Sequence, residues 1–143
     1  MNLDNVNKAI AVMERVKARG DNFDLRSWQD ARSEYLVQTN EEALHTCGTS
    51  ACFAGWLAVS PEFQADGGEV GPGGRPLLRE YRSSRAVMAW LGIDDDMALD
   101  LCGCGDDRVY GKTDSRSVTV YDVLAALYRL RDTGSPYPEE LAQ

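Results

Sequence analysis

The chain has 143 residues, of which 43% are hydrophobic and 27% are charged, and these ordinary globular values predict one domain spanning residues 1–143. A net charge of −8 argues against sequence-independent binding to nucleic acid or to anionic lipid, because contacts with phosphates need a basic surface. No apolar run approaches the ~18 residues of a transmembrane helix, and the N-terminus lacks the apolar stretch of a signal peptide, so we expect a cytoplasmic protein with reduced cysteines.

Helical periodicity covers most of the chain. Apolar residues at three- and four-residue spacing predict an amphipathic helix over residues 3–19, which Gly20 ends. The best-marked helix lies near the other end, where Thr119 and Asp122 form a capping-box pattern and Gly134 is a stop signal. Six other helices are expected. In the first half of the chain they are a short helix around Trp28, one over 31–38, one over 52–59, and a short one that begins at Pro61 with Ser60 as its cap. In the second half they are a helix over 79–91, which Gly92 ends, and an acidic helix that Asp94 caps.

Three segments lack helical periodicity. Residues 66–76 contain five glycines and two prolines, which predicts a flexible loop. Residues 102–117 read as a polar loop, and residues 135–143 as a tail on the surface. Together with the helices, these segments predict an all-α fold, a compact single-domain bundle of about five to seven short helices with a glycine-rich loop.

The stretch HTCGTSACFAGW, residues 45–56, places the only histidine beside two of the four cysteines. One interpretation is a cysteine nucleophile. Cys52 in the first turn of a helix would have a lowered thiol pKa, and His45 would be its base. The two residues lie on the same short segment, so a hydrogen bond between them needs a tight fold-back of the chain.

A second interpretation of this stretch is a structural zinc site. Its ligands would be Cys47, Cys52, Cys102 and Cys104, with His45 as a further donor. The spacings are C-x4-C and C-x-C, however, and not the two C-x2-C pairs of a zinc knuckle. The pattern is therefore a weak zinc signal.

The third interpretation is the start of a packed helix, and it is the one we favour. Gly48 would supply a turn and Thr49 the helix cap, while the small Cys52 and Gly55 would let another helix approach and Trp56 would anchor the core. Free cysteine is among the most buried residue types and usually behaves as a small hydrophobic residue.

The segment CGTSACFAGWLA, with FDLRSW before it and AWLGIDDDMALDLC and TVYDVLAALYRLRDTG after it, resembles a diffuse set of small uncharacterised proteins of bacteriophages, prophages and bacteria. These proteins share a C-G-T-x-x-C-x-A-G-W-like core, and the likeness covers most of residues 3–134 apart from the glycine-rich loop. The resemblance implies a phage or mobile-element accessory protein in the bacterial cytoplasm. The residues that carry the core motif are Cys47, Gly48, Thr49, Cys52, Gly55 and Trp56.

Positive charge is concentrated in residues 75–85. Arg79 and Arg82 share one face of the helix expected there, and Arg85 lies near that face. Clustered guanidinium groups hold a phosphate or carboxylate through paired hydrogen bonds, and the glycine-rich loop would add backbone amides. The segment is therefore a candidate anion site, although it matches neither a Walker nor a dinucleotide-binding motif.

Negative charge is concentrated in residues 93–107, which hold six aspartates and no basic residue. The run lacks the alternating pattern of a calcium loop. It is either a solvated face or an acidic face that binds a basic host protein. The aspartates are Asp94, Asp95, Asp96, Asp100, Asp106 and Asp107.

No complete catalytic set is present, so we expect a non-enzymatic accessory protein without a cofactor. It would bind a host or anti-phage-defence protein through the segregated acidic and arginine-rich surfaces. The alternative is a thiol- or anion-dependent activity, or small-ligand binding, centred on Cys47 and Cys52, with the arginine cluster holding the anion. A contact with nucleic acid through the basic face is a third, minor alternative, whose sign would be a steep salt dependence.

Overall fold

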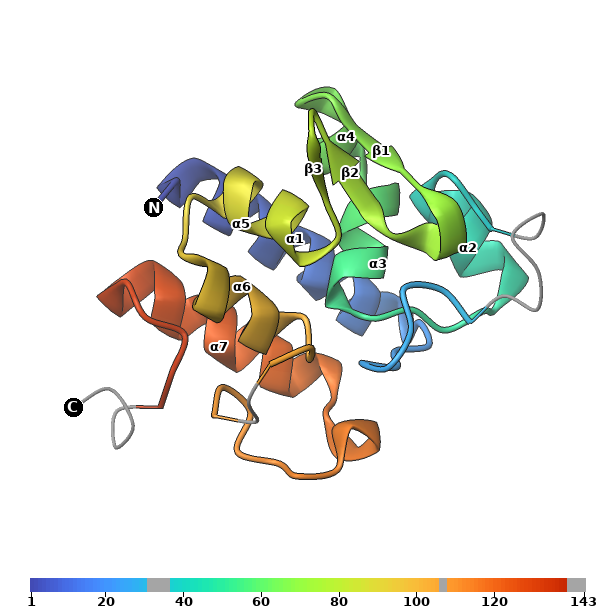
Figure 1. Ribbon diagram of the computed structural model, residues 1–143. Helices are drawn as coiled ribbons and strands as arrows, with labels where there is room; N and C mark the ends of the chain where they lie inside the picture. The colour runs from blue at the N-terminus through green and yellow to red at the C-terminus, as the bar shows by residue number, and fades with distance from the viewer. Residues whose placement is uncertain (31–36, 106–107, 139–143) are drawn as a thin grey trace.

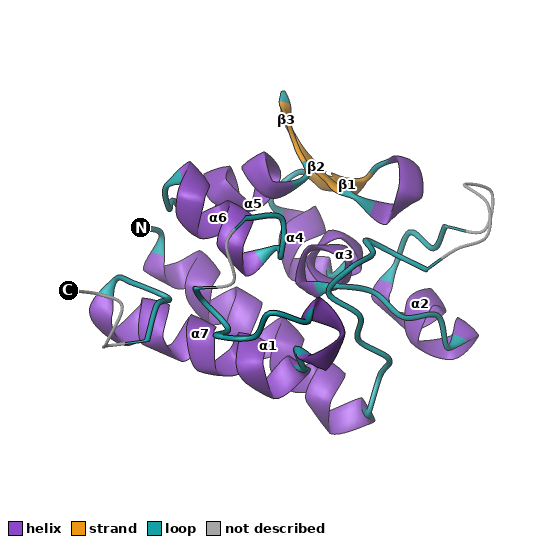
Figure 2. Ribbon diagram, turned by 60° about the horizontal axis from the view of Figure 1, so that its bottom comes forward, coloured by secondary structure: helices purple, strands orange, loops and turns teal. Residues whose placement is uncertain are grey.

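The computed structural model describes residues 1–30, 37–105 and 108–138. Helices α1 and α7 lie side by side along one side of the molecule, and α3 runs between α1 and a small sheet (Figures 1 and 2). The elements are α1 (Leu3–Arg19), α2 (Glu41–Cys47), α3 (Phe53–Val59), α4 (Pro61–Ala65), β1 (Gly68–Val70), a 3-10 turn (Pro72–Gly74), β2 (Pro76–Leu78), β3 (Tyr81–Arg82), α5 (Ser84–Leu91), α6 (Asp95–Leu101), a second 3-10 turn (Ser115–Ser117) and α7 (Val120–Thr133).

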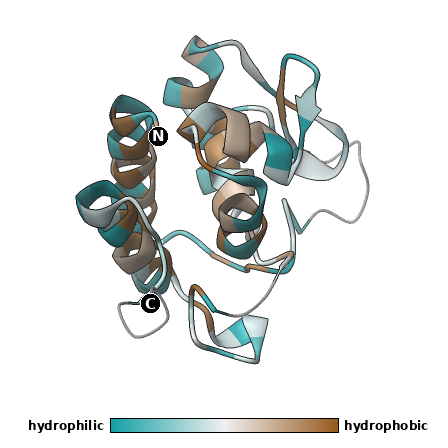
Figure 3. Ribbon diagram, turned by 60° about the vertical axis from the view of Figure 1, so that its left-hand side comes forward, coloured by the Kyte–Doolittle hydropathy of each residue, from teal (hydrophilic) through white to brown (hydrophobic). Residues whose placement is uncertain are grey.

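Most of the expected helix start and stop signals are confirmed. Gly20, Gly92 and Gly134 end α1, α5 and α7 in the left-handed conformation, as glycine at a helix end commonly does. The Ser60 hydroxyl accepts the Phe63 N–H at the start of α4. The capping box of Thr119 and Asp122 starts α7, and Asp94 caps α6. Hydrophobic and hydrophilic positions alternate around these helices (Figure 3).

Helix α3 forms the centre of the core, because every one of its residues is buried. It contacts α1 and the sheet, so no side of the helix is left to solvent. Its cap is Cys52, whose Sγ accepts the Gly55 N–H at 3.4 Å. The expected cap, Thr49, lies in the connection after Gly48, which ends α2. Trp56 is fully buried and donates its indole N–H to the Asn22 carbonyl.

The all-α expectation is wrong, because the glycine-rich segment folds as a three-stranded antiparallel sheet in the order β1-β2-β3. Gly68 pairs with Leu78, and Val70 with Pro76, so the expected loop at 66–76 is a hairpin. Gly73 has a φ of 75°, which suits glycine and closes the 3-10 turn between β1 and β2. The described fold is therefore a helix-rich mixture of seven α-helices and a small sheet.

The segment before α3 also differs from expectation. No helix forms around Trp28. Instead Phe23 makes a parallel bridge with Ala51, and the Cys52 N–H donates to the Ser27 carbonyl, so this segment is held against the entry to α3. Most of the helix expected over 31–38 lies outside the described residues. Helix α2, which Asn40 caps, was not predicted.

Residues 135–138 of the expected surface tail are docked onto the body of the protein. Pro136 is buried, and its carbonyl accepts the Arg129 Nε–H at 2.8 Å. The Tyr137 hydroxyl donates to the Asp100 carboxylate at 2.6 Å. Residues 139–143 of the tail lie outside the described part. None of the described helices has the length and the apolar character needed to cross a membrane.

Candidate functional site

The structure brings three of the four cysteines together. Cys52, Cys102 and Cys104 border one hollow of about 260 Å³, beside Trp28. Cys47 does not border it; this residue is exposed at the end of α2, where its Sγ contacts the Leu44 carbonyl. Among the described residues, no group of three or more His, Cys, Asp or Glu side chains is arranged to hold a metal ion. The four-cysteine zinc set, which was the second interpretation of the motif, is therefore not assembled among the described residues.

Burial makes these thiols hard to ionise. It raises the pKa of Cys52 to about 12 and that of Cys102 well above its usual range. The pKa of the Cys104 thiol is raised by partial desolvation as well. A helix start was expected to lower the pKa of Cys52, but desolvation outweighs the hydrogen bonds from the first turn of α3. Cys52 therefore lacks the thiolate character that a nucleophile needs.

His45 is held by a carboxylate and not by a thiol. Its Nδ1 pairs with the Asp21 carboxylate, whose side chain is only 3% exposed. Arg19 binds the other oxygen of Asp21 and also reaches Glu41. Arg15 extends this network from α1 by pairing with Glu41 of α2 and with Glu62 of α4. The network ties three helices together and leaves no nucleophile–base pair between His45 and Cys52.

The expected acidic face is divided. Asp94 accepts the Met97 N–H at 2.8 Å, and Asp95 and Asp96 follow it in the first turn of α6. Asp100, by contrast, is 3% exposed and accepts hydrogen bonds from the Tyr137 hydroxyl and from Arg108. Asp106 and Asp107 lie outside the described residues. The turn at residues 94–96 is thus the described part of this face that is accessible to a partner.

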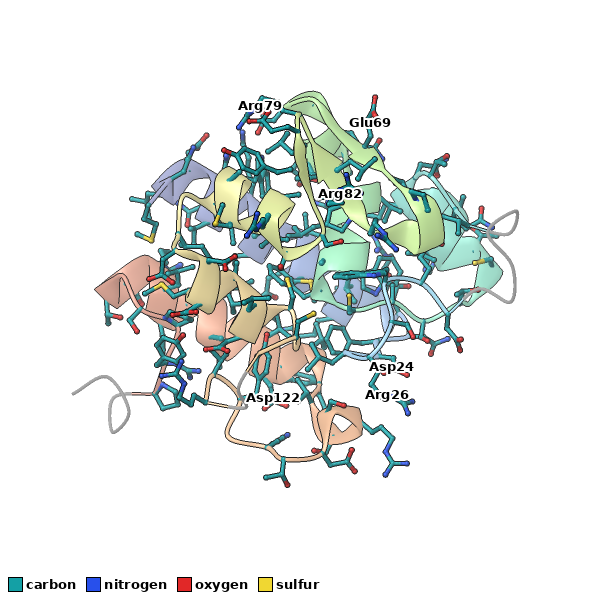
Figure 4. The ribbon with its side chains drawn as sticks, viewed as in Figure 1. Asp24, Arg26, Glu69, Arg79, Arg82 and Asp122 are labelled. Atoms are coloured by element: carbon teal, nitrogen blue, oxygen red, sulfur yellow. The ribbon has the colours of Figure 1, made fainter. Side chains whose placement is uncertain are left out.

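The expected arginine cluster lies on the sheet and not on a helix. Arg79 is in the turn between β2 and β3, Arg82 is on β3, and Arg85 is in the first turn of α5. Arg79 and Arg82 border an open hollow of about 530 Å³, which Arg75 joins and Arg85 does not. In Figure 4, Arg79 and Glu69 are labelled on opposite sides of the sheet and Arg82 between them. We call this the arginine hollow; its lining residues are Gly67, Glu69, Pro72, Arg75, Leu77, Arg79, Glu80, Tyr81 and Arg82.

The arginines of the arginine hollow, like Arg85, have no carboxylate partner among the described residues, whereas most other described arginines do. Within residues 1–30, 37–105 and 108–138, Arg79 and Arg82 have no carboxylate at ion-pair distance, and Arg75 donates to the Pro72 carbonyl instead. The arginines elsewhere that do pair with a carboxylate are Arg15, Arg19, Arg26, Arg108, Arg116 and Arg131. In a chain with a net charge of −8, this is a local excess of positive charge.

Backbone strain occurs at the same place. In the described part of the chain, Arg79 (φ 53°) and Ser83 (φ 59°) are the non-glycine residues with positive φ, and they stand directly before Glu80 and directly after Arg82. This conformation disfavours a side chain, which explains why the helix expected from residue 79 does not begin before Ser84. Strain held at non-glycine residues is typical of functional sites.

Comparison with known proteins adds no relative. No protein-family model matches the chain, no curated protein matches it, and no solved structure matches it.

Proposed function

We propose that the protein is a non-enzymatic accessory protein of the phage type, which binds a host or defence protein through the arginine hollow. The observation that carries this proposal is the contrast in pairing. Arg79 and Arg82 face solvent without a carboxylate partner among the described residues, whereas exposed arginines such as Arg26 and Arg116 pair with Asp24 and Asp114. Carboxylates of a partner would complete the missing pairs.

The residues that line the arginine hollow favour a protein partner over a small polyanion. Glu69 and Glu80 border the same hollow as the arginines. A compact phosphate compound would be repelled by these two carboxylates, whereas a protein surface places negative and positive groups separately. Leu77 lies between Glu69 and Arg82 in the sheet register and offers an apolar contact at the centre. The partner we propose is therefore a protein with an acidic patch.

The ionisation of Cys52 and the pairing of His45 support a non-enzymatic function. The alternative centred on Cys47 and Cys52 needs a reactive thiol near a base. Cys52 is buried with a raised pKa, and His45 is paired with Asp21. The exposed Asp94–Asp96 turn remains a second, weaker contact surface for the partner.

The test is a comparison of two charge-matched double variants. Arg79→Gln with Arg82→Gln removes two arginines of the hollow, and Arg116→Gln with Arg131→Gln removes two exposed arginines that already have carboxylate partners. Each protein is cross-linked in bacterial lysate, and the captured proteins are quantified by mass spectrometry. We expect the wild type and the control to capture the same acidic protein and the hollow variant to lose it.

Two results would contradict the proposal. Equal loss in both double variants would show that overall charge, not the hollow, governs capture. Unchanged capture by the hollow variant would move the interface elsewhere, and the Asp94–Asp96 turn would be the next surface to change. Titration with inorganic phosphate tests whether the hollow binds a small anion in place of a protein. Saturable binding of phosphate that requires Arg79 and Arg82 would make the hollow a small-anion site.

A further inference from the structure

Strand β3 is an edge whose backbone is available to another strand. The Ser83 N–H donates to the Pro76 carbonyl at 2.8 Å, so this pair of residues is a hydrogen-bonded position of the ladder. Hydrogen-bonded and non-hydrogen-bonded pairs alternate along antiparallel strands, so the next pair, Leu77 with Arg82, is non-hydrogen-bonded. The N–H and C=O of Arg82 therefore point away from β2.

Nothing in the described residues covers this edge. The sheet ends at β3, and neither backbone group of Arg82 bonds to another described group. Figure 2 shows the end of the β2–β3 hairpin projecting from the body of the molecule, while β3 also contacts α5. An exposed edge strand is a template for pairing with a further chain.

The side chains along β3 determine which charge is favoured on an added strand. Glu69, Leu77 and Arg82 are register partners, so their side chains lie on one face of the sheet, the face of the arginine hollow. A residue placed opposite Arg82 on an added strand would direct its side chain to the same face. A carboxylate there would meet the unpaired Arg82, whereas a lysine would be repelled.

We propose that the partner's acidic segment binds as an extended strand, added antiparallel to β3, with its acidic side chains directed toward Arg79 and Arg82. This inference rests on the proposed function and adds to it the conformation and sequence pattern of the bound segment. Acidic residues would alternate with apolar ones, because alternate side chains of a strand lie on one face. This spacing places one carboxylate opposite Arg82 and keeps the acidic groups apart, as the presence of Glu69 and Glu80 at the same hollow requires. The bends at Arg79 and Ser83 limit the edge to a short segment, so the affinity is modest and falls with added salt.

The experiment uses a capped peptide of alternating Glu and Val residues, with a Lys–Val peptide as the charge control. Binding to the full chain is followed by ¹H–¹⁵N NMR. We expect the Glu–Val peptide to bind, to shift the Arg82 amide signal and to slow its hydrogen exchange. The Lys–Val peptide should not bind.

Two methylated forms of the Glu–Val peptide test the backbone contact. In antiparallel pairing, the N–H and C=O of the peptide residue opposite Arg82 both bond to the backbone of Arg82, and this residue is a Glu. N-methylation of the Glu residues removes the N–H donor and should reduce the affinity about tenfold or more. N-methylation of the Val residues changes the opposite edge of the peptide and should leave affinity nearly unchanged. This second peptide controls for the loss of flexibility and for added bulk.

The outcomes separate the two proposals. If both methylated peptides bind as well as the parent peptide, or if the parent peptide fails to bind at millimolar concentration, strand addition is wrong while capture through the hollow stands on its own test. If the parent peptide binds Arg79→Gln/Arg82→Gln as tightly as the wild type, the peptide does not bind at the arginine hollow and strand addition at β3 is wrong, whereas loss of protein capture in the same double variant would still support the proposed function.

Discussion

Gly55 lies directly beneath the carbonyl group of Trp28, so closely that an added Cβ would overlap the carbonyl oxygen. The contact joins the central helix α3 to the segment before it, and it explains why the core motif has glycine at this position. The Trp28 carbonyl belongs to the backbone, so it cannot turn aside as a flexible side chain would.

Replacement of Gly55 by Ala should therefore destabilise the protein strongly. We expect a loss of about 3–5 kcal/mol in the free energy of unfolding, measured by urea denaturation. Gly20→Ala is the matched control, because Gly20 has a positive φ but open space around it. The control should lose only about 1 kcal/mol, from backbone strain alone. Equal losses in the two variants would refute the steric account.

The buried Cys52 thiol should make stability depend on alkaline pH. Its pKa rises from 9.0 to about 12 in the folded chain. The contribution is complete below about pH 9 and is lost toward pH 12, because in this window the unfolded chain gives up the thiol proton and the folded chain keeps it. The slope is at most about 1.4 kcal/mol per pH unit for one group.

The measurement is the urea midpoint between about pH 8 and pH 10.5 for three proteins, since this range spans the ionisation of an ordinary thiol. Cys52→Ala should show a shallower loss of stability than the wild type. Cys47→Ala removes an exposed thiol and should retain the wild-type slope. A wild-type slope in Cys52→Ala would show that other groups cause the alkaline loss.

The docked segment at residues 135–138 should depend on one phenolic hydroxyl. Tyr137→Phe removes a hydrogen bond to the buried carboxylate of Asp100, at a cost of about 1–2 kcal/mol. Thermal unfolding measures this loss, and limited proteolysis after residue 134 should become faster. Tyr121→Phe is the control, because Tyr121 is 66% exposed. Similar effects of the two substitutions would mean that Tyr137 does not hold the segment.

Chelation should leave the protein folded. The cysteines around Trp28 are not arranged as a metal centre, so we expect native mass spectrometry to give the metal-free mass. The thermal midpoint should be the same before and after treatment with a chelator. Zinc at one ion per chain, lost together with the fold, would overturn this assignment and would place a metal at Cys52, Cys102 and Cys104.

Short-range signals predicted most helix ends correctly. The hydroxyl of Ser60 before Pro61, the Thr119–Asp122 pair and the glycines at 92 and 134 act on the backbone within one turn. Their effect is therefore nearly independent of the rest of the fold. The burial of Trp56 was also readable, because a large aromatic residue among small apolar ones indicates a core helix.

The sheet was not predictable by the same means. Its strands have only two or three residues, which is too short for alternation to be visible, and they lie among glycines and prolines. Gly68 packs against the Phe63 ring and Gly74 against Gln29, so tertiary contacts fix the hairpin. Of the three arginines expected near one helix face, Arg79 and Arg82 border the same hollow and Arg85 does not, and their separation between a turn, a strand and a helix follows from this hairpin.

The pairing of the first and last described helices has a consequence for synthesis on the ribosome. Residues 20–119 are translated between α1 and α7, so the contact between these two helices, the most extensive contact of α1, cannot form until most of the chain has been made. Contacts between distant segments slow folding, and uncovered apolar surface attracts chaperones. A nascent chain stopped before α7 should therefore be a chaperone client, and release of the last helix should be the step that ends this association.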